Sequence, residues 1–193
     1  LVLLPAALTP GAAWSADTVA AARVNGAPAL LVDGVPVPPH MHFNTSWKPE
    51  VVADGLAESF SRAGIHLNQF DVNLDWGEDF DELDPEQATA RYRGTDARIR
   101  ALASIDPDAL VLLRVHMHPP VAWGDENPGE ILAFEDGTPI VASKWSAATS
   151  YASRRWREQA AQRLRALIDH LRTSGLEEFV LGYLIFVGQS GEW

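Results

Sequence analysis

The feature that most constrains the fold of this chain is a regular alternation of two kinds of segment. Four short segments of extended type, at 39–43, 65–76, 109–118 and 179–188, alternate with three segments whose apolar residues recur at helical spacing. These extended segments contain apolar runs, which are typical of parallel strands buried on both faces. The order therefore predicts an α/β fold in which helices pack on a parallel sheet.

The three helical segments are bounded by residues that favour helix ends. Gly64 and Gly175 suit the position just after a helix, and Pro85 suits the first turn of the second helix. The stripes that we expect to face the sheet are Val52, Leu56, Phe60 and Ala63; Ala88, Tyr92, Thr95, Ile99 and Leu102; and Trp156, Ala160, Leu164, Leu167, Ile168 and Leu171.

Two stretches lie outside this alternating series. The turn dipeptides Asn25-Gly26 and Asp33-Gly34 lie between short β-type runs and predict a small β-hairpin before the sheet. The long stretch 119–145 has no clear period, and we expect it to be irregular.

The N-terminus has the character of a targeting segment. Residues 1–16, LVLLPAALTPGAAWSA, form an apolar run that ends in small residues, as at the end of a secretory signal peptide cut near Ala13 or Ala16. A disordered apolar terminus is the alternative. We expect a folded domain over 17–193 in a secreted or periplasmic protein, with no other segment apolar enough to cross a bilayer.

Two architectures fit an alternating strand and helix order. An open doubly wound sheet would be favoured by a glycine-rich turn after the first strand, but HMHFNTSW contains no glycine. A TIM (β/α)₈ barrel needs about 250 residues and eight strands. Because the sequence contains four predicted strands, we predict the N-terminal half of a TIM barrel, with about four β/α units, preceded by the hairpin.

The charge and the cysteine content exclude several classes of function. A net charge of −11 argues against nucleic acid or an anionic membrane as the main partner, because both require a cationic face. The chain has no cysteine, which excludes thiolate chemistry and disulfides. A neutral or cationic small molecule is the more compatible ligand.

The tryptophans are concentrated at one end of the predicted sheet. Five of the seven follow the C-terminal ends of predicted strands, where barrels carry their functional loops. These five are Trp47, Trp76, Trp123, Trp145 and Trp193. An indole face packs on the C–H face of a sugar while nearby polar groups bind its hydroxyls. Any one of these rings could simply pack a loop, but together they favour a carbohydrate cleft.

Polar side chains alternate along the second and third strands and therefore share one side of each. They are Asp71, Asn73 and Asp75 on the second strand, and Arg114, His116 and His118 on the third. A buried arginine needs an acidic partner, so we expect Arg114 to pair with Asp71, either as a structural ion pair or as an organiser of the site. His66 and His170 are expected to be ordinary.

One acid follows the fourth strand. Glycoside hydrolysis needs a protonated carboxyl group that donates to the leaving oxygen and a second carboxylate that acts as nucleophile or base. Glu192 stands where a carboxylate would reach the mouth of a barrel, and Tyr183 and Trp193 would raise its pKa by reducing its solvation. A single loop glutamate is weak evidence by itself.

The ordered series of segments resembles a known family. The segments are VNGAPALLVDGVPVPPHMHFN, DWGEDFDELD, DALVLLRVHMHPPVAW with DENPGE, SYASRRWREQA and GYLIFVGQSGEW. Together they are similar to the first half of a β-galactosidase-like glycoside hydrolase of the family 42 type and related clan A enzymes. The resemblance covers everything after residue 16. It implies a TIM barrel, a β-galactoside-like or other oligosaccharide substrate, retaining hydrolysis, and no cofactor or metal.

The resemblance also assigns the reacting groups. Glu192 would be the general acid/base, and the nucleophile would follow a seventh strand beyond residue 193. Many clan A enzymes have asparagine directly before the acid/base, whereas this chain has Gly191. If the 193 residues act alone, we expect no hydrolysis, because one carboxylate is missing and the sheet edges are open.

Two rival functions remain open from the sequence. His40 and His42, which we expect on one side at the end of the first strand, resemble the first ligand pair of metal-dependent amidohydrolase barrels, and His116-Met117-His118 repeats their spacing. A non-catalytic carbohydrate-binding barrel would keep the tryptophans without needing Glu192.

Overall fold

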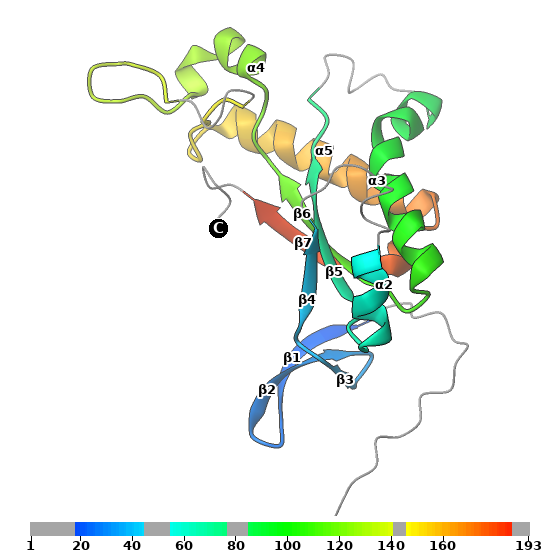
Figure 1. Cartoon of the computed structure of the whole chain (residues 1–193). Coiled ribbons are helices and arrows are strands. Elements are labelled where there is room, and N and C mark those ends of the chain that lie inside the picture. Colours follow the sequence, from blue (N-terminus) through cyan, green and yellow to red (C-terminus); the bar gives the residue numbers. More distant parts are fainter. Residues whose placement is uncertain (1–17, 45–54, 77–84, 141–145, 187–193) are drawn as a thin grey trace, which may run out of the picture.

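The computed structural model of the chain describes residues 18–44, 55–76, 85–140 and 146–186. Its centre is a sheet of four parallel strands in the sequential order β4-β5-β6-β7 (Figure 1). The strands are β4 (Met41–Asn44), β5 (Leu67–Asn73), β6 (Leu110–His116) and β7 (Val180–Phe186). The predicted α/β class and parallel sheet are confirmed.

Three helices form a layer on one face of this sheet. They are α2 (Gly55–Arg62), α3 (Pro85–Ile105) and α5 (Arg154–Thr173). Contacts run from α2 to α3 and from α3 to α5, and Figure 1 shows the three side by side. A doubly wound sheet would have helices on both faces and a reversal in strand order, and the described sheet has neither.

The main core lies between these helices and alternate residues of the strands. Phe70, Val72, Leu113 and Val115 are buried in one cluster with residues of all three helices. Because successive side chains of a strand point to opposite faces, Asp71 and Arg114 face away from the helices. The sheet therefore has an apolar, helix-covered face and a second face that carries charged groups.

The helix stripes agree only in part with the sequence. In α3 and α5 most of the expected residues are buried, but Leu164 and Ile168 are only partly so, while Arg163 and His170 are buried. The side chains of Val52 and Ala88 lie outside the described residues.

The prediction for α2 is wrong at two positions. Leu56 is 54% exposed and Ala63 is exposed, whereas Ala57 is buried. The helix is only eight residues long and turns Ala57 toward the core, so the buried face is shifted by one residue from the expected stripe. The glycine stops are confirmed, since Gly64 and Gly175 have φ of +76° and +66°.

The N-terminal unit is a three-stranded antiparallel sheet rather than a simple hairpin. It contains β1 (Val19–Val24), β2 (Ala27–Val32) and the short β3 (Val35–Val37). Both predicted turn dipeptides have positive φ at their two central residues, as the favoured two-residue hairpin turns require. The sequence indicated the two turns, but a strand of three residues was too short to recognise.

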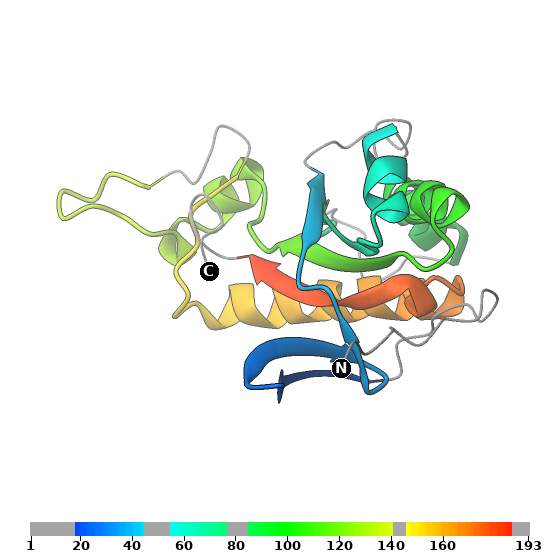
Figure 2. The same ribbon diagram turned by 60° about the horizontal axis from the view of Figure 1, so that its bottom comes forward.

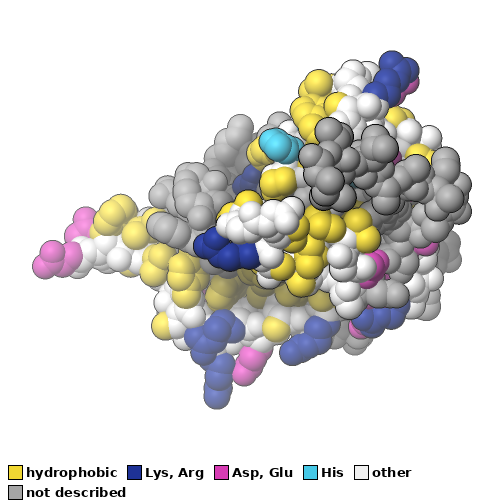
Figure 3. Space-filling view, turned by 90° about the horizontal axis from the view of Figure 1, so that it is seen from below, with side chains coloured by type: hydrophobic (Ala, Val, Ile, Leu, Met, Phe, Trp, Pro, Cys, Tyr) yellow, Lys and Arg dark blue, Asp and Glu magenta, His cyan; other side chains and the backbone are white. Residues whose placement is uncertain are grey.

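This unit covers the N-terminal ends of the parallel strands. Val32 of β2 is buried with Leu67 and Leu110, at the starts of β5 and β6. Leu67 and Leu110 point to the same face of the sheet as Asp71 and Arg114, so this contact lies on the face opposite α2, α3 and α5. In the view from below, hydrophobic side chains gather over β1–β3 (Figure 3).

The stretch after β6 is more ordered than expected. It contains α4 (Val121–Glu126) and the 3₁₀ helix η2 (Pro128–Glu130), and isolated bridges join Pro120 to Ser146 and Ile131 to Thr149. Part of this excursion, which we define as residues 119–140 and 146–150, projects from the rest of the molecule (Figures 1 and 2). Its order depends on pairing between distant residues, which has no local sequence pattern.

The domain boundary at 17 lies at the edge of the described residues. No helix of the described ranges combines the length and apolar character that a membrane span requires.

Candidate functional site

At the centre of the charged face, the Asp71 carboxylate lies between an arginine and a histidine of the neighbouring strand, Arg114 and His116, and we call these three residues the Asp71 cluster. Asp71 lies opposite Arg114 in the β5–β6 register, and Asn73 lies opposite His116. Arg114 Nε is 3.4 Å from Asp71 Oδ1, and His116 Nε2 is 3.5 Å from Asp71 Oδ2. The predicted Arg114–Asp71 pair is confirmed. Both distances are long for hydrogen bonds, so the attraction is mainly electrostatic.

This cluster favours a neutral imidazole. Burial lowers the pKa of His116 below its ordinary 6.5, and the negative charge of Asp71 opposes that shift. Burial is the larger effect, because the charged form loses more solvation than the carboxylate restores. At neutral pH, His116 therefore offers both a donor and an acceptor nitrogen.

Arg114 has a second contact on the same face. Its guanidinium carbon lies 4.7 Å from the centroid of the Phe43 ring, while the side chains of Arg114 and Asp71 are each only 14% exposed. Phe43 itself is 45% exposed. A cation–π contact and an ion pair thus hold Arg114 flat against the sheet.

A second arginine supports Asp71 from behind the sheet. Arg98 of α3 is 2% exposed and donates from Nη1 to the backbone carbonyl of Asp71 over 2.8 Å. Its guanidinium also lies 4.4 Å from the Phe70 ring centroid. Burial lowers the pKa of Arg98 to about 10, and the charge of Asp71 opposes this shift. The sequence pattern did not point to Arg98. The one indication was its position next to Ile99, at the edge of the apolar stripe of this helix.

Beyond the strand ends lies an open cavity of about 420 Å³. Its lining residues are Asn73, Leu74, Asp75, Trp76, His118, Pro120 and Ser146. Asp75 and His118 were expected within strands, but β5 ends at Asn73 and β6 at His116. The cavity nevertheless brings together three predicted groups from β5 and its continuation, Asn73, Asp75 and Trp76, with one from the segment after β6, His118. We call it the strand-end cavity.

The two described rim tryptophans differ in exposure. Trp76 is partly exposed and lines the strand-end cavity, with its ring 5.9 Å from that of Trp123 in an edge arrangement. Trp123 is 8% exposed and donates from Nε1 to Gln159 over 2.8 Å. Little of the Trp123 ring is therefore open to a ligand. The ring instead packs against the Trp76 indole. The physical reason is that α4 folds back onto α5.

The buried Arg163 was also missed by the sequence analysis. This residue of α5 holds its guanidinium 4.7 Å from the Trp76 ring centroid. In the sequence, Arg163 lies beside the apolar stripe of its helix, and nothing there indicates a contact with Trp76. Together with Trp123, it fixes the orientation of the Trp76 indole.

Four of the predicted site residues lie outside the described residues. These are Trp47, Trp145, Glu192 and Trp193.

The first histidine pair is placed differently from the expectation. His40 precedes β4 and is exposed, whereas His42 is 6% exposed and stacks on Phe60 of α2 with centroids 4.7 Å apart. His42 therefore faces the helix layer, on the opposite side of the sheet from Asp71. The pair also stands at the start of the strand, not at its end as predicted.

The two histidines expected to be ordinary each have an acidic partner. His66 Nδ1 is 2.9 Å from Asp106, and His170 Nε2 is 2.8 Å from Asp96. The second pair joins α5 to α3. Both pairs are structural ties, and no local sequence pattern indicates their partners, which lie 40 and 74 residues away.

One group within the described ranges has the composition of a metal site. Ligand atoms of His66, Asp106 and Asp108 lie within 4.8 Å of one another. Asp106 also accepts a hydrogen bond from the Asp108 backbone N–H, as an ordinary turn does. The group lies at the N-terminal end of β5, the opposite end of the sheet from the strand-end cavity.

The arrangement can bind a small polar molecule that has an apolar side. Amide, carboxylate, imidazole and hydroxyl groups surround one partly exposed indole, and the Asp71 cluster lies directly below them. A comparison with models of known protein families and with curated proteins finds no match to this chain.

Proposed function

We propose that the chain binds a β-linked glycoside at the C-terminal ends of its parallel strands, as part of an enzyme that hydrolyses the glycosidic bond. The observation that carries the proposal is the lining of the strand-end cavity. There the indole of Trp76 lies beside Asn73, Asp75, His118 and Ser146. Alternating hydroxyls and C–H faces are the feature of sugars that such a mixed lining suits.

The finer fold that we propose is half of a TIM barrel. In its support, the strands follow one another in sequential parallel order and the helices lie on one face. The N-terminal unit covers the opposite end of the strands from the cavity, as a barrel with its site at the C-terminal face allows. In this proposal β4 and β7 would pair with further strands of the barrel.

The proposed mechanism is retaining hydrolysis by two carboxylates. Glu192 is the general acid/base, which protonates the leaving oxygen and then activates water. The nucleophile lies outside the 193 residues. Asn73, Asp75 and His118 bind hydroxyl groups, and Trp76 packs against the sugar ring. We place the enzyme in a secreted or periplasmic location.

The Asp71 cluster organises the floor of this site. Asp71 and Arg114 hold each other at the level just below the cavity, and His116 presents a neutral imidazole beside them. Such an arrangement favours fixed hydrogen-bonding directions over mobile charges. Neither Asp71 nor Arg114 needs to react for this role.

Residues of the described ranges also bear on the two rival functions. The metal-dependent alternative receives no support from His42, which packs against α2. The non-catalytic binding alternative uses the same cavity and differs only in not requiring Glu192.

The deciding experiment compares two variants of the full-length protein with aryl β-galactosides. Glu192→Gln removes the proposed acid/base, and Glu178→Gln is a matched control on an exposed residue before β7. We expect Glu192→Gln to lower kcat by about 10²- to 10⁴-fold with little change in the affinity for substrate. The control should retain full activity.

Three results would contradict parts of the proposal. An unchanged rate for Glu192→Gln would remove this residue from the mechanism. Binding without hydrolysis by the wild-type protein would favour the non-catalytic alternative. Stoichiometric zinc, with activity lost on chelation, would overturn the glycosidase assignment.

A further inference from the structure

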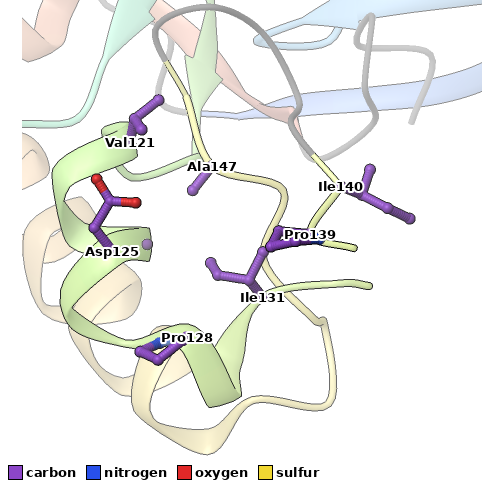
Figure 4. A pocket seen from close by; sticks show the side chains of 8 residues that line it. Val121, Asp125, Pro128, Ile131, Pro139, Ile140 and Ala147 are labelled. Carbon is purple, nitrogen blue, oxygen red and sulfur yellow. The ribbon is translucent and has the colours of Figure 1, made fainter. Parts of the chain in front are cut away.

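A second, smaller hollow lies within the excursion after β6. Its volume is about 230 Å³. The lining residues are Val121, Gly124, Asp125, Pro128, Ile131, Pro139, Ile140 and Ala147 (Figure 4). All of them except Asp125 are apolar or lack a side chain. We call it the apolar pocket.

The walls of this pocket are held by main-chain contacts. Ala147 N donates to the Pro119 carbonyl over 3.0 Å, and Leu132 N donates to the Ala148 carbonyl over 2.8 Å. A methyl group added at Gly124 would lie 2.8 Å from Ala147 Cβ, so α4 and the residue-147 segment pack as closely as glycine permits. The pocket is therefore a built feature of the excursion and not a gap between loose segments.

The apolar pocket and the strand-end cavity are neighbours along two segments. Pro120 and Ser146 line the cavity and form a β-bridge with each other. The next residues, Val121 and Ala147, line the pocket. The linings of the two hollows are therefore one residue apart on each of the two bridged segments.

The size and the charge of the pocket restrict its occupant. An apolar cavity of about 150 Å³ is enough to hold one benzene ring, so the pocket accommodates a single ring-sized group. The walls offer no hydrogen-bonding side chain except Asp125, whose carboxylate is exposed and lines the hollow. Its charge disfavours an anion and tolerates a neutral or cationic ring.

We propose that the apolar pocket binds the aglycone of the glycoside, and that this aglycone is a ring-sized apolar group without negative charge. The inference rests on the proposed function, since the sugar must occupy the strand-end cavity. It adds a selectivity for the leaving part of the substrate that the polar cavity alone would not give.

The test measures dissociation constants by calorimetry for four β-thiogalactosides, which resist hydrolysis and differ only in the aglycone: methyl, phenyl, 4-aminomethylphenyl and 4-carboxyphenyl. We expect phenyl to bind about tenfold more tightly than methyl, as burial of one ring allows. The 4-carboxyphenyl compound should bind more weakly than the 4-aminomethylphenyl compound. Equal affinities for methyl and phenyl would overturn the inference and leave the proposed function intact.

Two pairs of variants locate the effect. Ala147→Leu fills the pocket and should remove the phenyl advantage without weakening the binding of methyl β-thiogalactoside, while Ala133→Leu makes the same change on an exposed residue outside it. Val121→Phe serves the same purpose if Ala147→Leu does not fold. Asp125→Asn should abolish the discrimination by charge, and Glu126→Gln should not. An unaltered phenyl advantage in a folded pocket-filling variant would contradict the inference.

Failure of the proposed function gives a different pattern. If no galactoside binds, the carbohydrate proposal is wrong, and benzylamine alone then tests the pocket. Binding of benzylamine that Ala147→Leu abolishes would support an apolar site, whereas absence of binding would overturn it.

Discussion

At the scale of single residues, Asp71 makes contacts on both faces of the sheet. Its carboxylate meets Arg114 and His116 on the open face, and its backbone carbonyl accepts from Arg98 on the helix side. One residue of β5 is thus held from two directions. This fixes the strand position immediately below the strand-end cavity.

The first prediction concerns the pKa of His116. Asp71 raises this pKa by its charge, against the larger lowering by burial. Asp71→Asn removes the charge, so the pKa of His116 should fall further below 6.5. Titration of the imidazole C–H resonances by NMR measures the shift. Asp136→Asn, in the projecting part of the excursion, is the control, and a rise in the pKa of His116 would contradict the electrostatic account.

The second prediction follows from the same lowered pKa. Below pH 6.5 the unfolded chain binds a proton at His116 more readily than the folded chain. The free energy of unfolding should therefore decrease as the pH falls from about 6.5 through the lower folded-state pKa. Denaturant unfolding of wild type and His116→Gln over this range gives the contribution of His116 by difference. A difference that stays constant with pH would show that His116 titrates alike in both states.

The sequence could predict those site contacts that follow from the alternation of side chains along a strand. Alternation along strands is local, so it placed Asp71 and Arg114 on one face and made them partners. Arg98 and Arg163 were missed because their contacts depend on how helices are rotated over the sheet. Trp123 was expected at an open rim, but the folding back of α4 buries it.

At the scale of elements, side-chain ties supplement the apolar contacts between helices. His170 of α5 bonds to Asp96 of α3 and lies beside the Tyr92 ring, with centroids 4.9 Å apart. The start of α5 is also fixed, since Ser153 Oγ accepts from the backbone N–H of Trp156 over 3.0 Å. The capped end places Trp156 so that its indole N–H donates to the Met117 carbonyl, just beyond β6.

The third prediction tests this cap. Ser153→Ala leaves the Trp156 N–H without its acceptor and should lower the free energy of unfolding by about 1 kcal/mol. Ser153→Asp retains an acceptor at the same position and should preserve most of the stability. Chemical denaturation followed by circular dichroism measures both. Equal stability of wild type and Ser153→Ala would show that the cap contributes nothing.

Local rules were sufficient for the elements whose ends are set by their own residues. The turns at Asn25-Gly26 and Asp33-Gly34 and the helix stop at Gly175 are examples, because positive φ is a property of a few residue types. The face of α2 and the order within the excursion were not predictable in this way. Leu56 is exposed because packing against the sheet, rather than the helical period alone, decides which side is buried.

At the scale of the whole molecule, the face of the sheet opposite α2, α3 and α5 divides into two parts. The N-terminal unit covers the lower part, around Leu67 and Leu110. The upper part holds the Asp71 cluster and includes Phe43 and Leu184, which are 45% and 40% exposed. Partly open apolar residues around a charged centre support our proposal that further strands pack around this face.

The central claim is that the strand-end cavity binds a glycoside, and titration calorimetry with methyl β-thiogalactoside, which resists hydrolysis, tests it most directly. Asn73 lines the cavity and is exposed, so Asn73→Ala should fold normally. The variant should bind about tenfold more weakly, because it loses a hydrogen bond to a sugar hydroxyl. His40→Ala, at the opposite end of the sheet, should bind like wild type. Absence of binding to wild type, or equal affinity of wild type and Asn73→Ala, would contradict the claim.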